Sequence, residues 1–65
     1  MARGPQVYLL TLARALREIR NEMALLATDA SAPGAEAADI LSRALALLKR
    51  LQRALSLALA QALRR

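Results

Sequence analysis

The chain has no cysteine, histidine, tryptophan or phenylalanine among its 65 residues, and Tyr8 is its one aromatic residue. Without cysteine the chain can form no disulfide and offers no thiolate to a metal. Without histidine it lacks the commonest general base and metal ligand of proteins. These two absences narrow the catalytic and metal-binding chemistry open to the chain.

Long hydrophobic runs are also missing. No segment reaches the roughly 18 consecutive uncharged apolar residues that a transmembrane helix requires. Arg3 and the apolar residues 7–13 follow the order of a signal peptide, but the apolar run is short and Arg14 interrupts the candidate cleavage site. We therefore expect no signal peptide, no transmembrane segment and a cytoplasmic location.

Leucine, alanine and arginine dominate the chain. Hydrophobic residues make up 57% of it, which is unlike the composition of a disordered chain. Ten lysines and arginines against five aspartates and glutamates give a net charge of +5. We predict one small domain, 1–65. A chain of this length buries only about 60% of its extended surface, so a core of its own is marginally stable.

Glycine and proline occur at only two places, Gly4-Pro5 near the start and Pro33-Gly34 near the middle. Gly4 is predicted to cap a helix whose first residue is Pro5, because the N–H that proline lacks would be unpaired in a first turn anyway. Good helix formers then continue to about residue 28.

Turn-forming residues cluster at 29–34. Ser31 is the candidate N-cap of a second helix, with Pro33 in its first turn. Glu36 and Asp39 follow, where carboxylates suit the positive end of a helix dipole. The sequence therefore predicts a break between two helices at this point.

The predicted fold is all-α. It is a two-helix antiparallel hairpin with helices at about 5–28 and 33–65. At about 1.5 Å per residue, the second helix would extend past the first by roughly two turns.

Apolar residues of the first predicted helix recur at alternating intervals of three and four, which is typical of an amphipathic helix with one buried stripe. The acidic residues Glu18 and Glu22 are expected on the opposite side. In the second helix the apolar residues cover about half of the circumference, which is wider than the roughly 100° stripe of a surface helix. One partner helix cannot cover that width.

A lone hairpin of this kind would expose a contiguous apolar patch, which monomers rarely do. Two-helix chains of this length need a disulfide, a metal or oligomerisation to be stable, and the sequence supports neither of the first two. We therefore predict self-assembly into a four-helix or larger homo-oligomeric bundle. A two-fold dimer is the first choice, and higher cyclic symmetry is the alternative.

The predicted core and oligomer interface consists of the apolar residues of both helices that fall on these stripes. They are Leu9, Leu12, Leu16, Ile19, Met23, Leu26, Ile40, Leu41, Ala44, Leu45, Leu47, Leu48, Leu51, Leu55, Ala58, Leu59 and Ala62.

Candidate catalytic groups are few. Glu18 and Glu22 lie four residues apart, and paired carboxylates can act as acid and base or hold a metal. However, Arg14 and Arg17 stand beside them and no histidine joins them, which is typical of a solvated helix face. No Gly-rich phosphate loop is present. We predict no enzymatic activity, no catalytic residue, no metal site, no cofactor and no small-molecule substrate.

No acidic residue follows Asp39, whereas six basic residues do. Such a helix could bind nucleic-acid phosphates electrostatically or lie on an anionic membrane with its leucines buried. It has no aromatic residue for base stacking and no aromatic anchor for a membrane. A solubilising face on an oligomer is therefore the favoured interpretation, with membrane or nucleic-acid binding as the alternative. The six residues are Arg43, Lys49, Arg50, Arg53, Arg64 and Arg65.

Residues 12–23 read LARALREIRNEM. Their anchors Leu12, Leu16, Ile19 and Met23 have the spacing of a helix that binds in a groove. The segment resembles the death-motif helix of pro-apoptotic proteins, which inserts into a groove on their pro-survival relatives. The resemblance implies a partner protein for this helix, although Arg20 stands where that motif has a small residue and Asn21 where it has an aspartate.

The whole chain resembles computationally designed helical hairpins that assemble into symmetric homo-oligomers. The shared features are two full-length helices, one short turn, an alanine and leucine interior, and local patterns that all favour one fold. The resemblance implies a structural role and production in an expression host. The surface, rich in arginine and poor in lysine, leaves a small natural protein from a genome of high GC content as the alternative.

Overall fold

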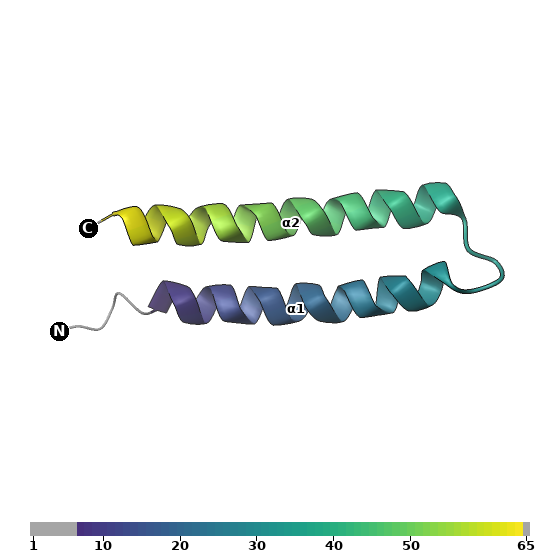
Figure 1. Ribbon diagram of the computed structural model, residues 1–65, viewed down its shortest axis with the longest axis horizontal. Helices are drawn as coiled ribbons and strands as arrows, with labels where there is room; N and C mark the ends of the chain where they lie inside the picture. The colour runs from purple at the N-terminus through teal and green to yellow at the C-terminus, as the bar shows by residue number, and fades with distance from the viewer. Residues whose placement is uncertain (1–6, 65) are drawn as a thin grey trace.

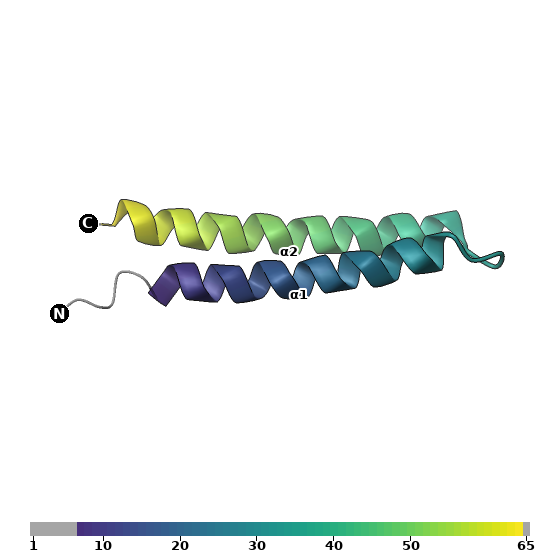
Figure 2. The same cartoon turned by 60° about the horizontal axis from the view of Figure 1, so that its bottom comes forward.

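The computed structural model describes residues 7–64, which form two helices joined by a short turn. Helix α1 spans Val7–Ala30 and helix α2 spans Ala37–Leu63. The two helices lie side by side along their length and run in opposite directions (Figures 1 and 2). The predicted all-α antiparallel hairpin is confirmed.

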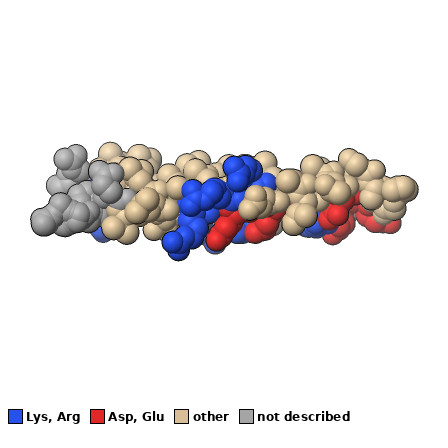
Figure 3. All heavy atoms as spheres, turned by 90° about the horizontal axis from the view of Figure 1, so that it is seen from below, with Lys and Arg blue, Asp and Glu red and all other residues tan. Residues whose placement is uncertain are grey.

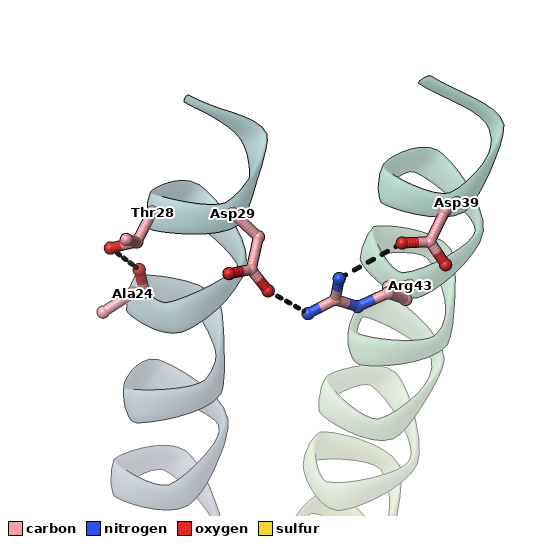
Figure 4. Close-up of polar contacts among 5 residues, drawn as sticks. All are labelled: Ala24, Thr28, Asp29, Asp39 and Arg43. Atoms are coloured by element: carbon pink, nitrogen blue, oxygen red, sulfur yellow. Dashed lines mark hydrogen bonds and ion pairs between the residues drawn. The ribbon is translucent and has the colours of Figure 1, made fainter. Parts of the chain in front are cut away.

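Helix α1 ends later than predicted because two hydroxyl side chains extend its hydrogen bonding. The Thr28 hydroxyl donates to the Ala24 carbonyl at 3.1 Å, as Figure 4 shows. The Ser31 hydroxyl and backbone N–H both donate to the Ala27 carbonyl, at 3.1 Å and 3.2 Å. Ser31 therefore closes the first helix, and the prediction that it caps the second helix is wrong.

Helix α2 begins after an extended residue, Glu36, whose φ and ψ are −104° and 121°. Its side chain makes no capping hydrogen bond, and its carbonyl accepts the N–H of Ile40 at 3.0 Å. Pro33 lies in the turn four residues before Ala37, so its predicted place in the first turn of the helix is wrong. Asp39 does lie in that first turn, where its carboxylate suits the helix dipole.

The two helices are nearly equal in length. Helix α1 has 24 residues and α2 has 27, so α2 is longer by three residues and not by the two turns predicted. Helix α2 ends with the Arg64 N–H donating to the Gln61 carbonyl at 3.2 Å. The predicted cap at Gly4 and helix start at Pro5 lie outside the described residues, as does Arg65.

The buried core is small and lies in the half of the hairpin near the turn. Ile19, Leu26 and Leu47 form a buried cluster, and Ile19 is the most buried of them at 4% exposure. Alanines continue the line of contact toward the open end, where Ala58 is buried. The partly buried residues along this line are Tyr8, Leu12, Ala13, Ala15, Ile40, Ala44, Leu51, Ala54 and Ala62.

Candidate interaction surface

The 17 residues predicted for the core and oligomer interface divide into three groups within this single chain. Four are buried, namely Ile19, Leu26, Leu47 and Ala58. Five are partly buried, namely Leu12, Ile40, Ala44, Leu51 and Ala62. Eight are exposed, and we call them the apolar face: Leu9, Leu16, Met23, Leu41, Leu45, Leu48, Leu55 and Leu59.

The predicted stripe of α1 is therefore split by the structure. Leu12, Ile19 and Leu26 contact α2, whereas Leu9, Leu16 and Met23 remain exposed. Small or aromatic neighbours take their places in the contact, with Tyr8 and Ala15 partly buried in α1 and Ala54 partly buried in α2. These three residues, like the partly buried Ala13, lie outside the predicted interface. Tyr8 and Ala15 lie seven positions apart, and Ala54 lies seven positions from the buried Leu47.

Arg43 joins the two helices near the turn. Its guanidinium donates from Nη2 to Asp29 Oδ2 at 2.7 Å and from Nη1 to Asp39 Oδ2 at 3.3 Å (Figure 4). Both hydrogen bonds raise the pKa of Arg43, and the one to Asp29 has the larger effect. Two acidic residues therefore engage one of the six basic residues predicted to form a solubilising face.

Arg50 makes a second link between the helices, two turns further along α2. Its Nη1 donates to Glu22 Oε1 at 2.6 Å. Glu22, expected opposite the apolar stripe, lies opposite the exposed leucines of that stripe but beside its buried residues, at the edge of the contact between the helices. A shallow groove lies between the two ion pairs and is lined by Glu22, Leu25, Leu26, Arg43, Ala46, Leu47 and Arg50.

The ion pairs mark one side of the hairpin. Three of these charged residues, Glu22, Asp29 and Arg50, each follow a buried residue by three positions. The buried residues are Ile19, Leu26 and Leu47, in the same order. Three positions correspond to a turn of about 60° around an α-helix. The charged residues of both helices meet on this side of the hairpin, which we call the ion-pair edge.

The apolar face lies on the opposite side. Leu16 and Met23 precede the buried residues Ile19 and Leu26 by three positions. They therefore lie about 60° around the helix from those buried residues, on the side away from the ion-pair edge. In α2, Leu55 precedes the buried Ala58 in the same way. In an antiparallel pair, equal rotation on both helices leads to the same side, so both helices contribute to one broad apolar surface.

The exposure of this surface is large. Leu41 and Leu48 are 68% and 58% exposed, and the other members of the apolar face are between 37% and 60% exposed. Figure 3 views the molecule from below, where α1 lies in Figure 1. The acidic side chains gather along the lower edge of that view, while most of the upper edge carries uncharged residues.

Other kinds of site are not seen in the part of the chain that the structure describes. Residues 7–64 contain no group of three acidic, cysteine or histidine side chains that could hold a metal ion. Over the same residues, neither helix combines the length and apolar character needed to cross a bilayer. The chain matches no family model, no curated protein and no solved structure.

Proposed function

We propose that this protein is a structural, self-assembling helical bundle without catalytic activity, and that a second copy of the chain covers the apolar face. The observation that carries this proposal is an exposed leucine surface, two helices wide, opposite an edge whose charges are paired. Such a surface resembles the core-facing side of a helical bundle that lacks its other half.

The spacing within the apolar face favours a helical partner. Leu41, Leu48 and Leu55 lie seven residues apart, and Leu45 and Leu59 lie between and beyond them. A seven-residue repeat matches helices that pack at about 20° in a left-handed bundle. A lipid surface makes no such demand on spacing.

The small size of the core favours a second copy. Among the described residues only Ile19, Leu26, Leu47 and Ala58 are buried, which is little for a 65-residue chain. Oligomerisation would add a second core, and a closed two-fold dimer is the commonest symmetric solution. The resemblance to designed homo-oligomeric hairpins implies the same structural role.

The two alternatives fit the structure less well. Groove binding by residues 12–23 would use Leu12 and Ile19, but both already contact α2, so the hairpin would have to open. Binding of the basic helix to lipid or nucleic-acid phosphates would compete with the pairs that Arg43 and Arg50 make with carboxylates.

The mass in solution tests the proposal. We expect light scattering after size exclusion, at two concentrations and moderate salt, to give a fixed multiple of 7.0 kDa. The variant Leu48→Asp should dissociate, because it would bury an unpaired charge in the interface. Leu57→Asp is the matched control, since Leu57 is also exposed, at 62%, but lies outside the apolar face.

A folded monomer of 7.0 kDa would overturn self-assembly. Circular dichroism with vesicles of anionic lipid, and with duplex DNA, would then show whether the apolar face or the basic residues bind those ligands. A Leu48→Asp variant that keeps the full mass would instead show that the assembly uses another surface.

A further inference from the structure

The two interhelical ion pairs show which residues of α1 and α2 lie at the same height along the hairpin. In both pairs, Asp29 with Arg43 and Glu22 with Arg50, the residue numbers add up to 72. A residue of α1 therefore lies at the same height as the α2 residue for which the two residue numbers add up to 72.

This register gives the apolar face an ordered set of layers. On this side of α1, the 3–4 spacing continues from Leu9 through Ala13, Leu16, Arg20, Met23 and Ala27. On the same side of α2, it continues from Leu41 through Leu45, Leu48, Gln52, Leu55 and Leu59. Each series contains one polar residue, and both are exposed.

The two polar residues, Arg20 and Gln52, lie level with each other because their numbers also complete 72. One polar layer therefore crosses the middle of the face, with apolar layers on both sides. Two leucines of α2 lie level with alanines of α1, since Leu59 lies level with Ala13, and Leu45 with Ala27.

Building on the proposed function, we propose that Arg20 and Gln52 set the register of a two-fold dimer in which α2 of each subunit packs antiparallel against α1 of the other. The two-fold axis runs parallel to the helices, so each residue of one subunit lies at the same height as its copy in the other subunit. The Gln52 carbonyl oxygen accepts a hydrogen bond from the guanidinium of Arg20 of the partner subunit. Every neighbouring pair of helices in the resulting four-helix bundle is antiparallel.

The alternative two-fold axis, perpendicular to the helices, is less favourable in charge and in shape. If it passed through the polar layer, it would place Arg20 against Arg20 of the partner subunit, which brings two like charges together. It would also place Leu45 against Leu59 of the partner subunit, and Ala13 against Ala27. Large residues would then meet large residues in these layers, whereas the axial arrangement packs Leu45 against Ala27 and Leu59 against Ala13 of the partner subunit.

The polar layer also opposes slippage. A shift of one subunit by seven residues would place Arg20 against Leu45 or Leu59 of the partner and bury its charge against leucine. A single polar position within an apolar helical interface is known to specify register and oligomeric state at a cost in stability. Arg20 and Gln52 are thus specificity-determining residues of the interface.

Single-cysteine variants test the geometry, because the chain has no cysteine of its own. We would refold mixtures of Ala13→Cys with Leu59→Cys, and of Leu45→Cys with Leu59→Cys, and oxidise them mildly. A disulfide forms only where the Cβ atoms approach to about 4 Å. We expect a cross-linked dimer from the first mixture. We expect no cross-linked dimer from the second mixture, and none from any single variant on its own.

Cross-linking in the second mixture only would establish the perpendicular axis and overturn the proposal, and so would a lack of cross-linking in both. The mass of the reduced variants separates this failure from that of the proposed function. A dimer with the wrong cross-links refutes only the geometry, whereas a monomer refutes the self-assembly itself.

The double variant Arg20→Leu with Gln52→Leu tests the role of the polar layer. We expect a higher melting temperature together with more than one assembly by light scattering, because the feature that selects the register is gone. A single dimeric species that keeps the cross-linking pattern would show that the layer does not determine specificity.

Discussion

Arg50 donates from Nη1 to Glu22 Oε1 at 2.6 Å, across 28 residues of sequence and from one helix to the other. The pair between Arg43 and Asp29 lies on the same side of the hairpin. Because the charges meet on one side, the leucines that remain lie on the other.

The pair between Glu22 and Arg50 is expected to contribute little free energy despite its short distance, because both side chains are nearly half exposed. Glu22→Gln should lower the free energy of unfolding by about 0.2–1 kcal/mol. Urea denaturation of Glu22→Gln, Arg50→Gln and the double variant would give the coupling energy. A coupling well above that range would mean that the pair is shielded from water in the assembled protein.

The contribution of Arg43 should not vary across the neutral pH range. Its partners Asp29 and Asp39 raise the pKa of Arg43 in the folded chain, and stabilisation from a raised pKa is complete below the unfolded value and lost as pH rises through the folded one. The difference in stability between the wild type and Arg43→Gln should thus be constant from pH 7 to about pH 10, and a fall within that window would contradict the prediction.

Ile19 should be the most sensitive position of the intramolecular core, because it is the most buried residue at 4% exposure. Ile19→Ala should cost about 2–5 kcal/mol through lost transfer free energy and the cavity left behind. Leu10→Ala is a suitable control, since Leu10 is 69% exposed outside the apolar face. Thermal unfolding followed by circular dichroism should show a large loss for the first variant and little change for the second.

The start of α2 can be strengthened. Glu36 occupies the N-cap position but makes no side-chain capping hydrogen bond, whereas serine accepts the N–H of the second or third helical residue readily. Glu36→Ser should therefore raise the free energy of unfolding, measured by urea denaturation, by about 0.5–1 kcal/mol. Ser31→Ala, by comparison, should have a smaller effect than the loss of a true N-cap, since Ser31 bonds to the end of α1.

The existence and type of both helices follow from the sequence, because residues 7–30 and 37–63 contain no glycine or proline. The ends were harder to predict. Ser31 has the chemistry of an N-cap, yet its hydroxyl and N–H reach the Ala27 carbonyl. Hydroxyl residues can serve either end of a helix, and which end they serve depends on backbone geometry that composition does not reveal.

The choice of contact face depended on the partner helix. Hydrophobicity alone favours Leu9 and Leu16 over Tyr8 and Ala15 as contacts of α1, yet the structure has the reverse. Alanines let two helices approach closely, and the two interhelical ion pairs add to the same rotation. The signal in the sequence is the matching spacing of opposite charges, since Glu22 and Asp29 lie seven positions apart in α1, as Arg43 and Arg50 do in α2.

The distribution of large and small residues along the contact has a consequence for motion. Ile19, Leu26 and Leu47 lie in the half near the turn, while the contact toward the open end is made largely by alanine. The hairpin should therefore fray from the open end, with backbone amides exchanging their hydrogens fastest there and slowest beside the turn. The short connection closes the loop at little entropic cost, so folding can begin at that end and proceed like a zipper toward the termini.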